Sequence, residues 1–131
     1  MKILGLGLDL IETARIQDSL DRFGERFLNR VFLVGETDYC LKMKFPARHL
    51  AARFAAKEAV SKAFGTGVGH ALGWKDMEIC RQESGQPYLV LHHKGAELAK
   101  ARGVTGSLIT LTHHESAAAA VAILYGMDDS N

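Results

Sequence analysis

The chain has 131 residues, of which 16 are Lys or Arg and 15 are Asp or Glu, so its formal net charge is +1 at pH 7. This length suits a single domain, residues 1–131, that buries roughly two thirds of the surface of its unfolded chain. Hydrophobic residues at 47% and charged residues at 24% are typical of a globular protein and argue against disorder. The near-neutral charge excludes a strongly basic chain that binds nucleic acid through bulk electrostatics.

Cysteine usage and apolar runs bear on the cellular compartment. Cys40 and Cys80 have neither CxxC spacing nor a neighbouring His or Cys partner, so the sequence predicts no disulfide framework and no zinc site. The longest apolar run, residues 117–125, is shorter than the ~18 residues that a membrane span needs. The apolar N-terminal segment has Asp9 at its centre and no small-residue cleavage site, which disfavours a signal peptide. We therefore expect a cytoplasmic protein with no membrane partner.

Hydrophobic periodicity predicts the elements of the first half of the chain. Residues 3–11 are expected to form a buried strand. Residues 13–32 follow a helical pattern, in which Gly24 can bend or break the helix. Residues 48–64 form the strongest predicted helix, because they are rich in alanine, contain no Gly or Pro and are followed directly by Gly65.

Two hairpins with a short helix between them are predicted for the second half. The expected strands are residues 75–82, 87–92, 107–112 and 117–124, and the expected helix is residues 97–102. The whole chain then forms one small α+β domain of mostly antiparallel strands, with helices packed on one side.

Asp9 lies within the apolar segment GLGLDL. This segment is not a dinucleotide fingerprint, because Leu10 stands where a third glycine is needed and the glycines lie within a strand instead of after it. An ionised Asp among apolar neighbours is costly unless it is paired or binds a cation. Two interpretations stay open: Asp9 coordinates a cation, or it caps the next helix or pairs with a nearby arginine.

The helix at residues 48–64 has two contrasting sides. Small residues that permit close packing share one side: Ala52, Ala56, Ala59, Val60 and Ala63. Phe54, Glu58, Ser61 and Lys62 share the other side, next to a glycine-rich loop. Glu58 and Lys62 have the spacing of an ordinary surface salt bridge. The alternative is a carboxylate for a hard cation such as Mg²⁺ and a lysine for a phosphate.

The loop that begins Gly65-Thr66-Gly67 also has two interpretations. It follows a helix, so the helix dipole opposes an anion there, and a phosphate would need backbone N–H groups, Thr66 and Lys62 to outweigh that effect. The alternative is a helix stop with a flexible connection.

Two further polar groups have commonplace explanations. His113 belongs to a THHE sequence at an expected turn, where no further zinc ligand has suitable spacing. Arg15, Arg22 and Arg26 lie beside an apolar helix stripe. Their face is either solvated or a docking surface for an acidic helical partner.

Two long motifs carry a resemblance to a known family. GLGLDLIETARI and RFAAKEAVSKAFGTGVG, with the GQP hairpin and the ending ITLTHHESAAAAVAIL, resemble the holo-acyl-carrier-protein synthases, the small bacterial phosphopantetheinyl transferases. The resemblance covers nearly the whole chain in order; His114 and Ser116 depart from the family pattern. It implies transfer of 4′-phosphopantetheine from coenzyme A to a serine of apo acyl carrier protein, release of adenosine 3′,5′-bisphosphate, and a role in fatty-acid biosynthesis.

The resemblance also implies roles for particular residues. Asp9 and Glu58 would hold Mg²⁺, and Glu58 and Lys62 would carry the catalysis. Deprotonation of the serine would use Glu58 or a metal-bound water, and we favour the water because a carboxylate on a metal is a poorer base. The residues implied near the coenzyme are Lys62, Gly65, Thr66, Gly67, Pro87, Thr112 and His113.

Partners follow from the same resemblance. Arg15 matches an arginine of the family's carrier-docking helix, and the helical wheel extends this face to Arg22 and Arg26. The family is typically a homotrimer with active sites between subunits. The alternative is a non-catalytic module that binds coenzyme A or docks a carrier protein, which the presence of Asp9, Glu58 and Lys62 disfavours. A nucleic-acid partner is not expected, because no aromatic residues interleave with the basic face.

Overall fold

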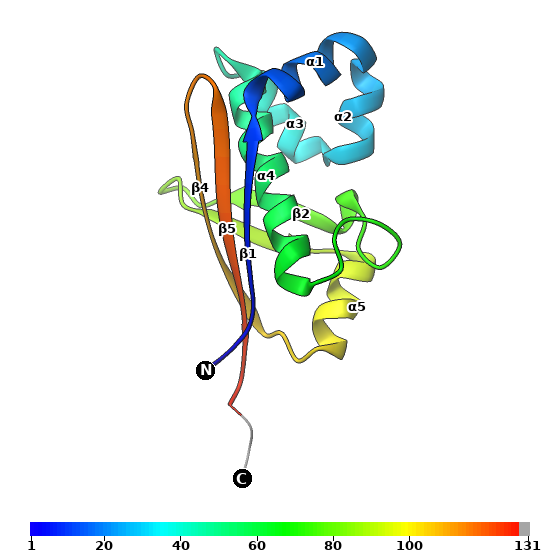
Figure 1. Ribbon diagram of the computed structural model, residues 1–131, viewed down its shortest axis with the longest axis vertical. Helices are drawn as coiled ribbons and strands as arrows, with labels where there is room; N and C mark the ends of the chain where they lie inside the picture. The colour runs from blue at the N-terminus through cyan, green and yellow to red at the C-terminus, as the bar shows by residue number, and fades with distance from the viewer. Residues whose placement is uncertain (129–131) are drawn as a thin grey trace.

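The computed structural model describes residues 1–128 and packs one long helix, α4, against a three-stranded sheet (Figure 1). The elements in chain order are β1 (Lys2–Glu12), α1 (Thr13–Phe23), α2 (Glu25–Val31), α3 (Val34–Leu41), α4 (Pro46–Phe64), the 3-10 helix η1 (Trp74–Asp76), β2 (Met77–Arg81), β3 (Pro87–Leu91), α5 (His93–Ala101), β4 (Gly106–His113) and β5 (Ala117–Gly126). No helix within this described part is long and apolar enough to cross a bilayer.

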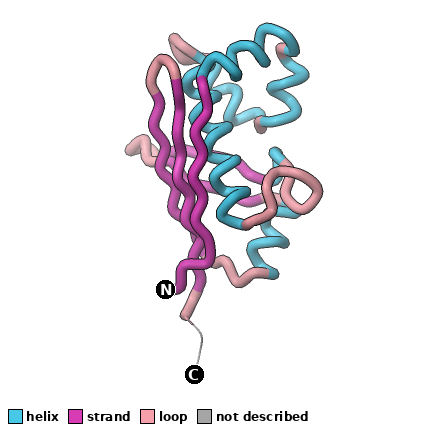
Figure 2. Tube along the Cα trace, in the orientation of Figure 1, coloured by secondary structure: helices cyan, strands magenta, loops and turns pink. Residues whose placement is uncertain are grey.

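The strands form two antiparallel sheets. The larger sheet has the order β1-β5-β4, so that β1 and β4 are its edges, and β2 and β3 form a separate hairpin. Figure 2 shows the helices gathered on one side of the larger sheet. The predicted α+β class, with mostly antiparallel strands and helices on one side, is confirmed.

The glycines of GLGLDL let the backbone of α4 lie almost on β1. A Cβ added to Gly7 would lie 1.8 Å from the carbonyl oxygen of Ala59, and one added to Gly5 would lie 2.0 Å from that of Ala63. Successive residues of a strand point to opposite faces, so Asp9 lies on the same side as the two glycines. The glycines therefore serve close helix–strand packing, and they bring Asp9 next to α4.

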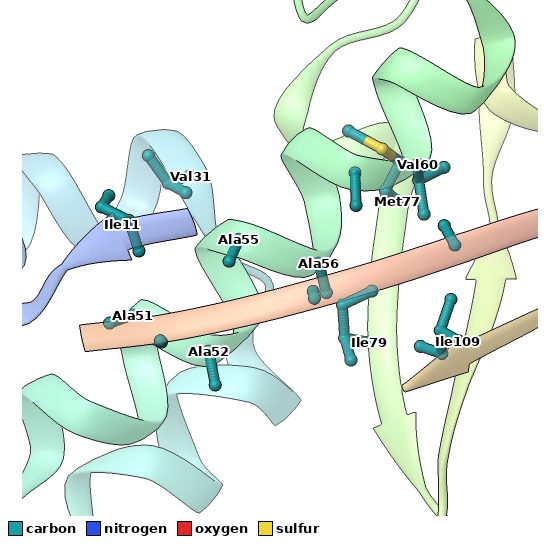
Figure 3. Close-up of a cluster of buried hydrophobic side chains, with 14 of the residues drawn as sticks. Ile11, Val31, Ala51, Ala52, Ala55, Ala56, Val60, Met77, Ile79 and Ile109 are labelled. Atoms are coloured by element: carbon teal, nitrogen blue, oxygen red, sulfur yellow. The ribbon is translucent and has the colours of Figure 1, made fainter. Parts of the chain in front are cut away.

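The core forms where α4, the sheet and the β2–β3 hairpin meet. Figure 3 shows small side chains of α4 together with larger ones from its neighbours. The labelled residues are Ile11, Val31, Ala51, Ala52, Ala55, Ala56, Val60, Met77, Ile79 and Ile109. The packing role predicted for the alanine-rich side of α4 is therefore confirmed.

The helical segments differ from the sequence prediction in several places. Helix α5 begins at His93, although the predicted helix began at residue 97. The predicted helix at residues 13–32 is two helices, broken at Gly24, whose positive φ of 54° suits glycine. Helix α3 was not predicted, because VGETDYCL has no clear apolar period, and it is held instead by a long-range contact of Glu36. The chain is in a 3-10 turn at Trp74–Asp76, where residues 75–82 were expected to be a strand throughout.

The polar side of α4 is more buried than its pattern predicts. Ser61, expected on an open face, has no exposed surface, and its hydroxyl donates to the carbonyl of Glu58. Arg53 and Lys57 are buried as well. Of the residues that were expected to be accessible, Lys62 is exposed and Glu58 is half-buried.

The close contact between α4 and β1 can be tested with Gly7→Ala. We expect this substitution to lower the free energy of unfolding by about 3 kcal/mol, because the new methyl group meets a helix backbone that cannot rotate away. Gly69→Ala is the matched control, since its Cβ meets no atom within 4 Å, and we expect a change within about 0.5 kcal/mol. Urea unfolding followed by circular dichroism measures both, and equal losses would contradict the packing argument.

Candidate functional site

An ion pair joins β1 to the C-terminal part of α4. Lys62 Nζ lies 2.9 Å from Asp9 Oδ1 and also donates to the carbonyl oxygen of Leu8 at 3.0 Å. Half of the Lys62 side chain is exposed, so its ammonium group can still meet a ligand. Of the interpretations left open for Asp9, the partner is thus a lysine and not an arginine, and Lys62 pairs with Asp9 instead of with Glu58.

Glu58 lies beside this pair. Burial raises the pKa of Glu58, and the negative charge of Asp9 raises it further, while Lys62 and Arg15 act in the opposite direction. Asp9 and Glu58 therefore face the same region. Within the described residues, Asp9 forms an ion pair with Lys62, whereas Glu58 forms none. Arg15, at the start of α1, is near enough for its charge to act on Glu58.

The donor set of this site fits a hard divalent cation. Asp9 and Glu58 supply carboxylate oxygens, the ligand type that Mg²⁺ prefers. Residues 1–128 contain no group of three or more His, Cys, Asp or Glu side chains that could hold a metal alone. An ion at Asp9 and Glu58 would complete its coordination with water and substrate oxygens, as Mg²⁺ commonly does.

The glycine-rich loop caps α4. The backbone N–H groups of Gly65, Thr66 and Gly67 donate to the carbonyls of Lys62 or Ser61 at 3.0 to 3.3 Å. These N–H groups therefore do not form an open nest for a phosphate, and the helix-stop interpretation describes their bonding. A Cβ added to Gly65 or Gly67 would meet nothing within 4 Å, so the loop leaves open space next to Lys62.

His113 belongs to a second cluster, which is basic. Its ring centroid lies 4.7 Å from that of His49, near the start of α4. Burial lowers the pKa of His113, and the charges of Arg48, Arg81 and Arg53 lower it further. His113 is thus not the exposed turn residue that its sequence context suggested, since it ends β4 and packs against α4.

The arginines of this basic cluster lack carboxylate partners within the described residues. The guanidinium carbons of Arg53 and Arg81 lie 4.4 and 5.0 Å from the ring centroid of Tyr39. Arg53 is only 4% exposed, and its Nε has no hydrogen-bond partner. Several arginines without carboxylate partners, one of them with an unpartnered Nε, make this cluster suitable for an anion.

The other two residues implied near the coenzyme, Pro87 and Thr112, lie on different sheets. Pro87 pairs in register with Arg81, which places it at the basic cluster. Thr112 precedes His113 on β4, so it points to the opposite face, where it is exposed. The structure therefore brings Pro87 and His113 to one place and leaves Thr112 on the outer face.

Helix α4 separates the basic cluster from the carboxylates. His49 and Glu58 are about two and a half turns and roughly 13 Å apart along α4, so they project from opposite sides of it. Asp9 and His113 likewise lie on the two opposite edge strands of the sheet. One chain therefore does not bring Asp9, Glu58 and Lys62 together with His113.

The predicted arginine face spans α1 and α2. Arg15, Arg22 and Arg26 are all exposed. Arg22 is paired with Asp18 at 3.6 Å, and the guanidinium carbons of Arg22 and Arg26 each lie 5.8 Å from the ring centroid of Phe23. The face is therefore basic and aromatic, although Asp18 offsets part of its charge.

A cavity of about 410 Å³ lies between this face and α4. Its lining includes Phe23, Phe27, Phe54 and Trp74, with Arg26 and Arg30 among the polar residues. The rings of Phe54 and Trp74 are 4.7 Å apart. Phe54 is one turn before Glu58 on the same side of α4, so Glu58 lies one turn from the lining of the cavity.

Sequence reasoning missed the partners of His113. Arg48, His49 and Arg53 lie at the start of α4, and the i, i+4 spacing of His49 and Arg53 places both on one side of the helix. That spacing was an available signal. No signal in the sequence could have shown that Arg81 and Tyr39 belong to the cluster, because their position depends on how the hairpin and α3 pack.

Comparisons with known proteins identify the class and then the family. The family model described as the 4′-phosphopantetheinyl transferase superfamily matches residues 5–122. The holo-[acyl-carrier-protein] synthase of Koribacter versatilis is 42% identical over 93% of this chain and 98% of its own length. The holo-[acyl-carrier-protein] synthase of Chlamydia trachomatis serovar D is 46% identical over 92% of this chain and 98% of its own length. The structure of the Helicobacter pylori holo-[acyl-carrier-protein] synthase in complex with coenzyme A superposes with a TM-score of 0.82 at 29% identity, covering 92% of this chain and 99% of that one. The chain belongs to the holo-[acyl-carrier-protein] synthase family of phosphopantetheinyl transferases, and it is an enzyme.

The burial of Glu58 and the nearby charge of Asp9 predict a pH-dependent stability difference. A carboxyl group whose pKa is higher in the folded protein than in the unfolded chain costs stability above that pKa, and the cost disappears as pH falls. We expect Glu58→Gln to be more stable than the wild type at neutral pH, and the difference to shrink towards pH 4.5, the ordinary pKa of Glu. Unfolding without divalent cations measures this, with the exposed Glu115→Gln as control. A difference that is independent of pH, or that grows on acidification, contradicts the assignment.

Proposed function

We propose that this enzyme transfers 4′-phosphopantetheine from coenzyme A to a serine of an apo acyl carrier protein and releases adenosine 3′,5′-bisphosphate. We further propose that the reaction depends on Mg²⁺ and serves fatty-acid biosynthesis. The observation that carries the proposal is the group of Asp9, Glu58 and Lys62. The names of the relatives and the coenzyme A bound by the Helicobacter pylori protein support the two substrates.

The carboxylate site is suited to the pyrophosphate of coenzyme A. Asp9 and Glu58 would hold Mg²⁺, which supplies positive charge to the phosphate oxygens when it is bound. The half-exposed ammonium group of Lys62 would contact the same phosphates. Its hydrogen bond to Asp9 raises the pKa of Lys62, which keeps it charged at neutral pH.

The chemical step joins the carrier serine to the phosphate that carries pantetheine. The serine oxygen forms a bond to that phosphorus, and the bond from the phosphorus to the bridging oxygen of the pyrophosphate breaks. Such transfers depend mainly on in-line positioning and on charge neutralisation. A water beside Glu58 would take the serine proton in preference to Glu58 itself, because a carboxylate that also holds a metal is a poorer base.

The basic cluster suits the remaining phosphate of coenzyme A. The 3′-phosphate and the pyrophosphate are attached to the same ribose, so one coenzyme cannot contact His113 and Glu58 of one chain across α4. A site built between two chains removes this conflict, because one subunit can supply Asp9, Glu58 and Lys62 and its neighbour Pro87 and His113. This division supports the homotrimer with sites between subunits that the resemblance implies.

The outer face of the sheet supports the same assembly. Leu6, Leu8 and Leu10 of β1 point away from α4 and are 66%, 62% and 70% exposed. Val121 and Ile123 of β5 lie in register beside them. A contiguous apolar surface of this kind marks an interaction site.

The arginine face suits the carrier protein. Arg15, Arg22 and Arg26 would steer an acidic carrier helix, and Arg15 lies near Glu58. The alternative function, a module that only binds coenzyme A or a carrier, needs no metal and produces no covalent change. The reaction product therefore distinguishes the two functions.

Intact mass spectrometry of an apo acyl carrier protein tests the reaction. With coenzyme A and Mg²⁺, we expect the carrier to gain one phosphopantetheine, and without Mg²⁺ no gain. Asp9→Asn and Glu58→Gln should slow the transfer by about a hundredfold or more, because both remove charge that holds the metal. The exposed Glu115→Gln is the control and should retain the wild-type rate. Near-normal turnover of Glu58→Gln would refute its role, and folded enzyme that modifies none of several carriers would favour the binding module.

Mixing two inactive variants tests the composite site. Glu58→Gln and His113→Ala would each be slow alone, since each damages one half of every site. After joint refolding, about one site in four should combine two unaltered halves if subunits mix at random, and activity should reappear. Sedimentation should show a trimer in all samples. A mixture no more active than the sum of its parts would mean that both residues act within one chain, or that His113 is not part of the site.

A further inference from the structure

A buried ion pair lies directly behind the carboxylate site. Lys57 precedes Glu58 on α4, and its Nζ lies 2.7 Å from Oε1 of Glu36 on α3. The two side chains are 0% and 1% exposed. Burial lowers the pKa of Lys57, and the charge of Glu36 opposes this change.

The bonding capacity of this pair is filled within the protein. Lys57 Nζ also donates to the carbonyl oxygens of Val31 at 2.7 Å and Trp74 at 3.2 Å, so all three of its protons have acceptors. Glu36 accepts from the backbone N–H groups of Leu33 at 2.9 Å and Ile79 at 3.0 Å. The pair is thus not free to contact substrate, and it ties α2, α3, α4, η1 and β2 together at one point.

Two of these bonds reach the wall of the cavity beside Glu58. Val31 and Trp74 both line that cavity, and Trp74 contacts Phe54, which lies one turn before Glu58. Arg26 lines the same cavity from α2, the helix that Lys57 holds through Val31. A single ammonium group therefore connects α2, which carries Arg26, and the Trp74 wall to α4.

Stability alone is a weak explanation for such a pair. Replacing a buried ion pair by apolar residues of similar volume is often neutral or stabilising. An apolar side chain at position 57 would fill the space, but it would leave the carbonyls of Val31 and Trp74 without their donor. A lysine at position 57 supplies a hydrogen bond to each of these two carbonyls, which an apolar side chain cannot do.

We propose that Lys57 is a positioning residue for the carrier protein, and that its bonds to Val31 and Trp74 set the approach of the carrier serine to Glu58. The inference rests on the proposed transfer reaction. Lys57 contacts none of Asp9, Lys62 or the loop after α4, so its effect should fall on the carrier and not on coenzyme A.

Two variants of the pair separate positioning from stability. Lys57→Met with Glu36→Leu removes both charges and both wall bonds, while the space stays filled. Glu36→Gln keeps Lys57 and its bonds to Val31 and Trp74, but it weakens the pair and so also lowers stability. Leu124→Ala, a buried residue of β5, serves as a destabilised control outside this network. All proteins are compared at a temperature at which circular dichroism shows them folded.

The kinetic readout is the transfer rate as a function of each substrate. For the double variant we expect kcat/KM for the carrier to fall by about tenfold to a hundredfold, because a small displacement of the reacting groups is enough for such a loss. KM for coenzyme A should stay within about twofold of the wild type. Glu36→Gln and Leu124→Ala should keep both constants near the wild-type values.

Fluorescence gives a readout that does not depend on activity. Trp74 is the only tryptophan of the chain, so its emission and its quenching by acrylamide report on the cavity wall. The double variant should show a shifted emission and stronger quenching, whereas the two other variants should resemble the wild type.

The outcomes are distinct. A folded double variant with wild-type carrier kinetics and unchanged Trp74 emission overturns the inference. A loss of kcat/KM for the carrier in all three variants, in proportion to their loss of stability, overturns it as well. If the double variant does not fold, a Glu36→Gln protein with raised carrier KM and normal stability also contradicts it, because the wall bonds are then intact. Wild-type protein that modifies no carrier would overturn the proposed function itself.

Discussion

The contact between the backbones of α4 and β1 is the constraint on which the rest of the structure depends. Only glycine at positions 5 and 7 allows the carbonyls of Ala63 and Ala59 to come so near the strand. A helix this close to a sheet must present small side chains, which explains the alanine-rich sequence of α4. The same contact turns Lys62 towards Asp9, so the carboxylate site follows from backbone packing.

Burial of α4 on most of its circumference divides its polar residues into two groups. A buried polar group needs partners inside the protein, and Lys57 finds all of its partners there. Glu58 and Arg53 do not find all of their partners within the protein. Burial and the charge of Asp9 raise the pKa of Glu58, and Arg53 keeps an unpartnered Nε. Residues whose hydrogen-bonding groups are all paired within the protein organise the fold. Residues with unpaired polar groups are available to bind a ligand.

The sequence was informative where chemistry is local and uninformative where it is long-range. The strand around Asp9, the helix around Glu58 and Lys62, and the interruption at Gly24 all depend on neighbours within a few residues, and each was predicted. Helix α3 and the pairing of Glu36 with Lys57 depend on segments 21 residues apart, and no local pattern signals them. His113 was assigned to a turn for the same reason, since its partner His49 lies on another element.

Strand β1 serves the site and the proposed assembly with alternate residues. Gly5, Gly7 and Asp9 face α4, and the leucines between them face outward. Because a strand has a period of two, a shift of one residue in its register would bury the leucines against α4 and expose Asp9. The proposed trimer and the carboxylate site are therefore linked through one register. An interface that covers the leucines would therefore lie on the opposite face of the same strand from Asp9.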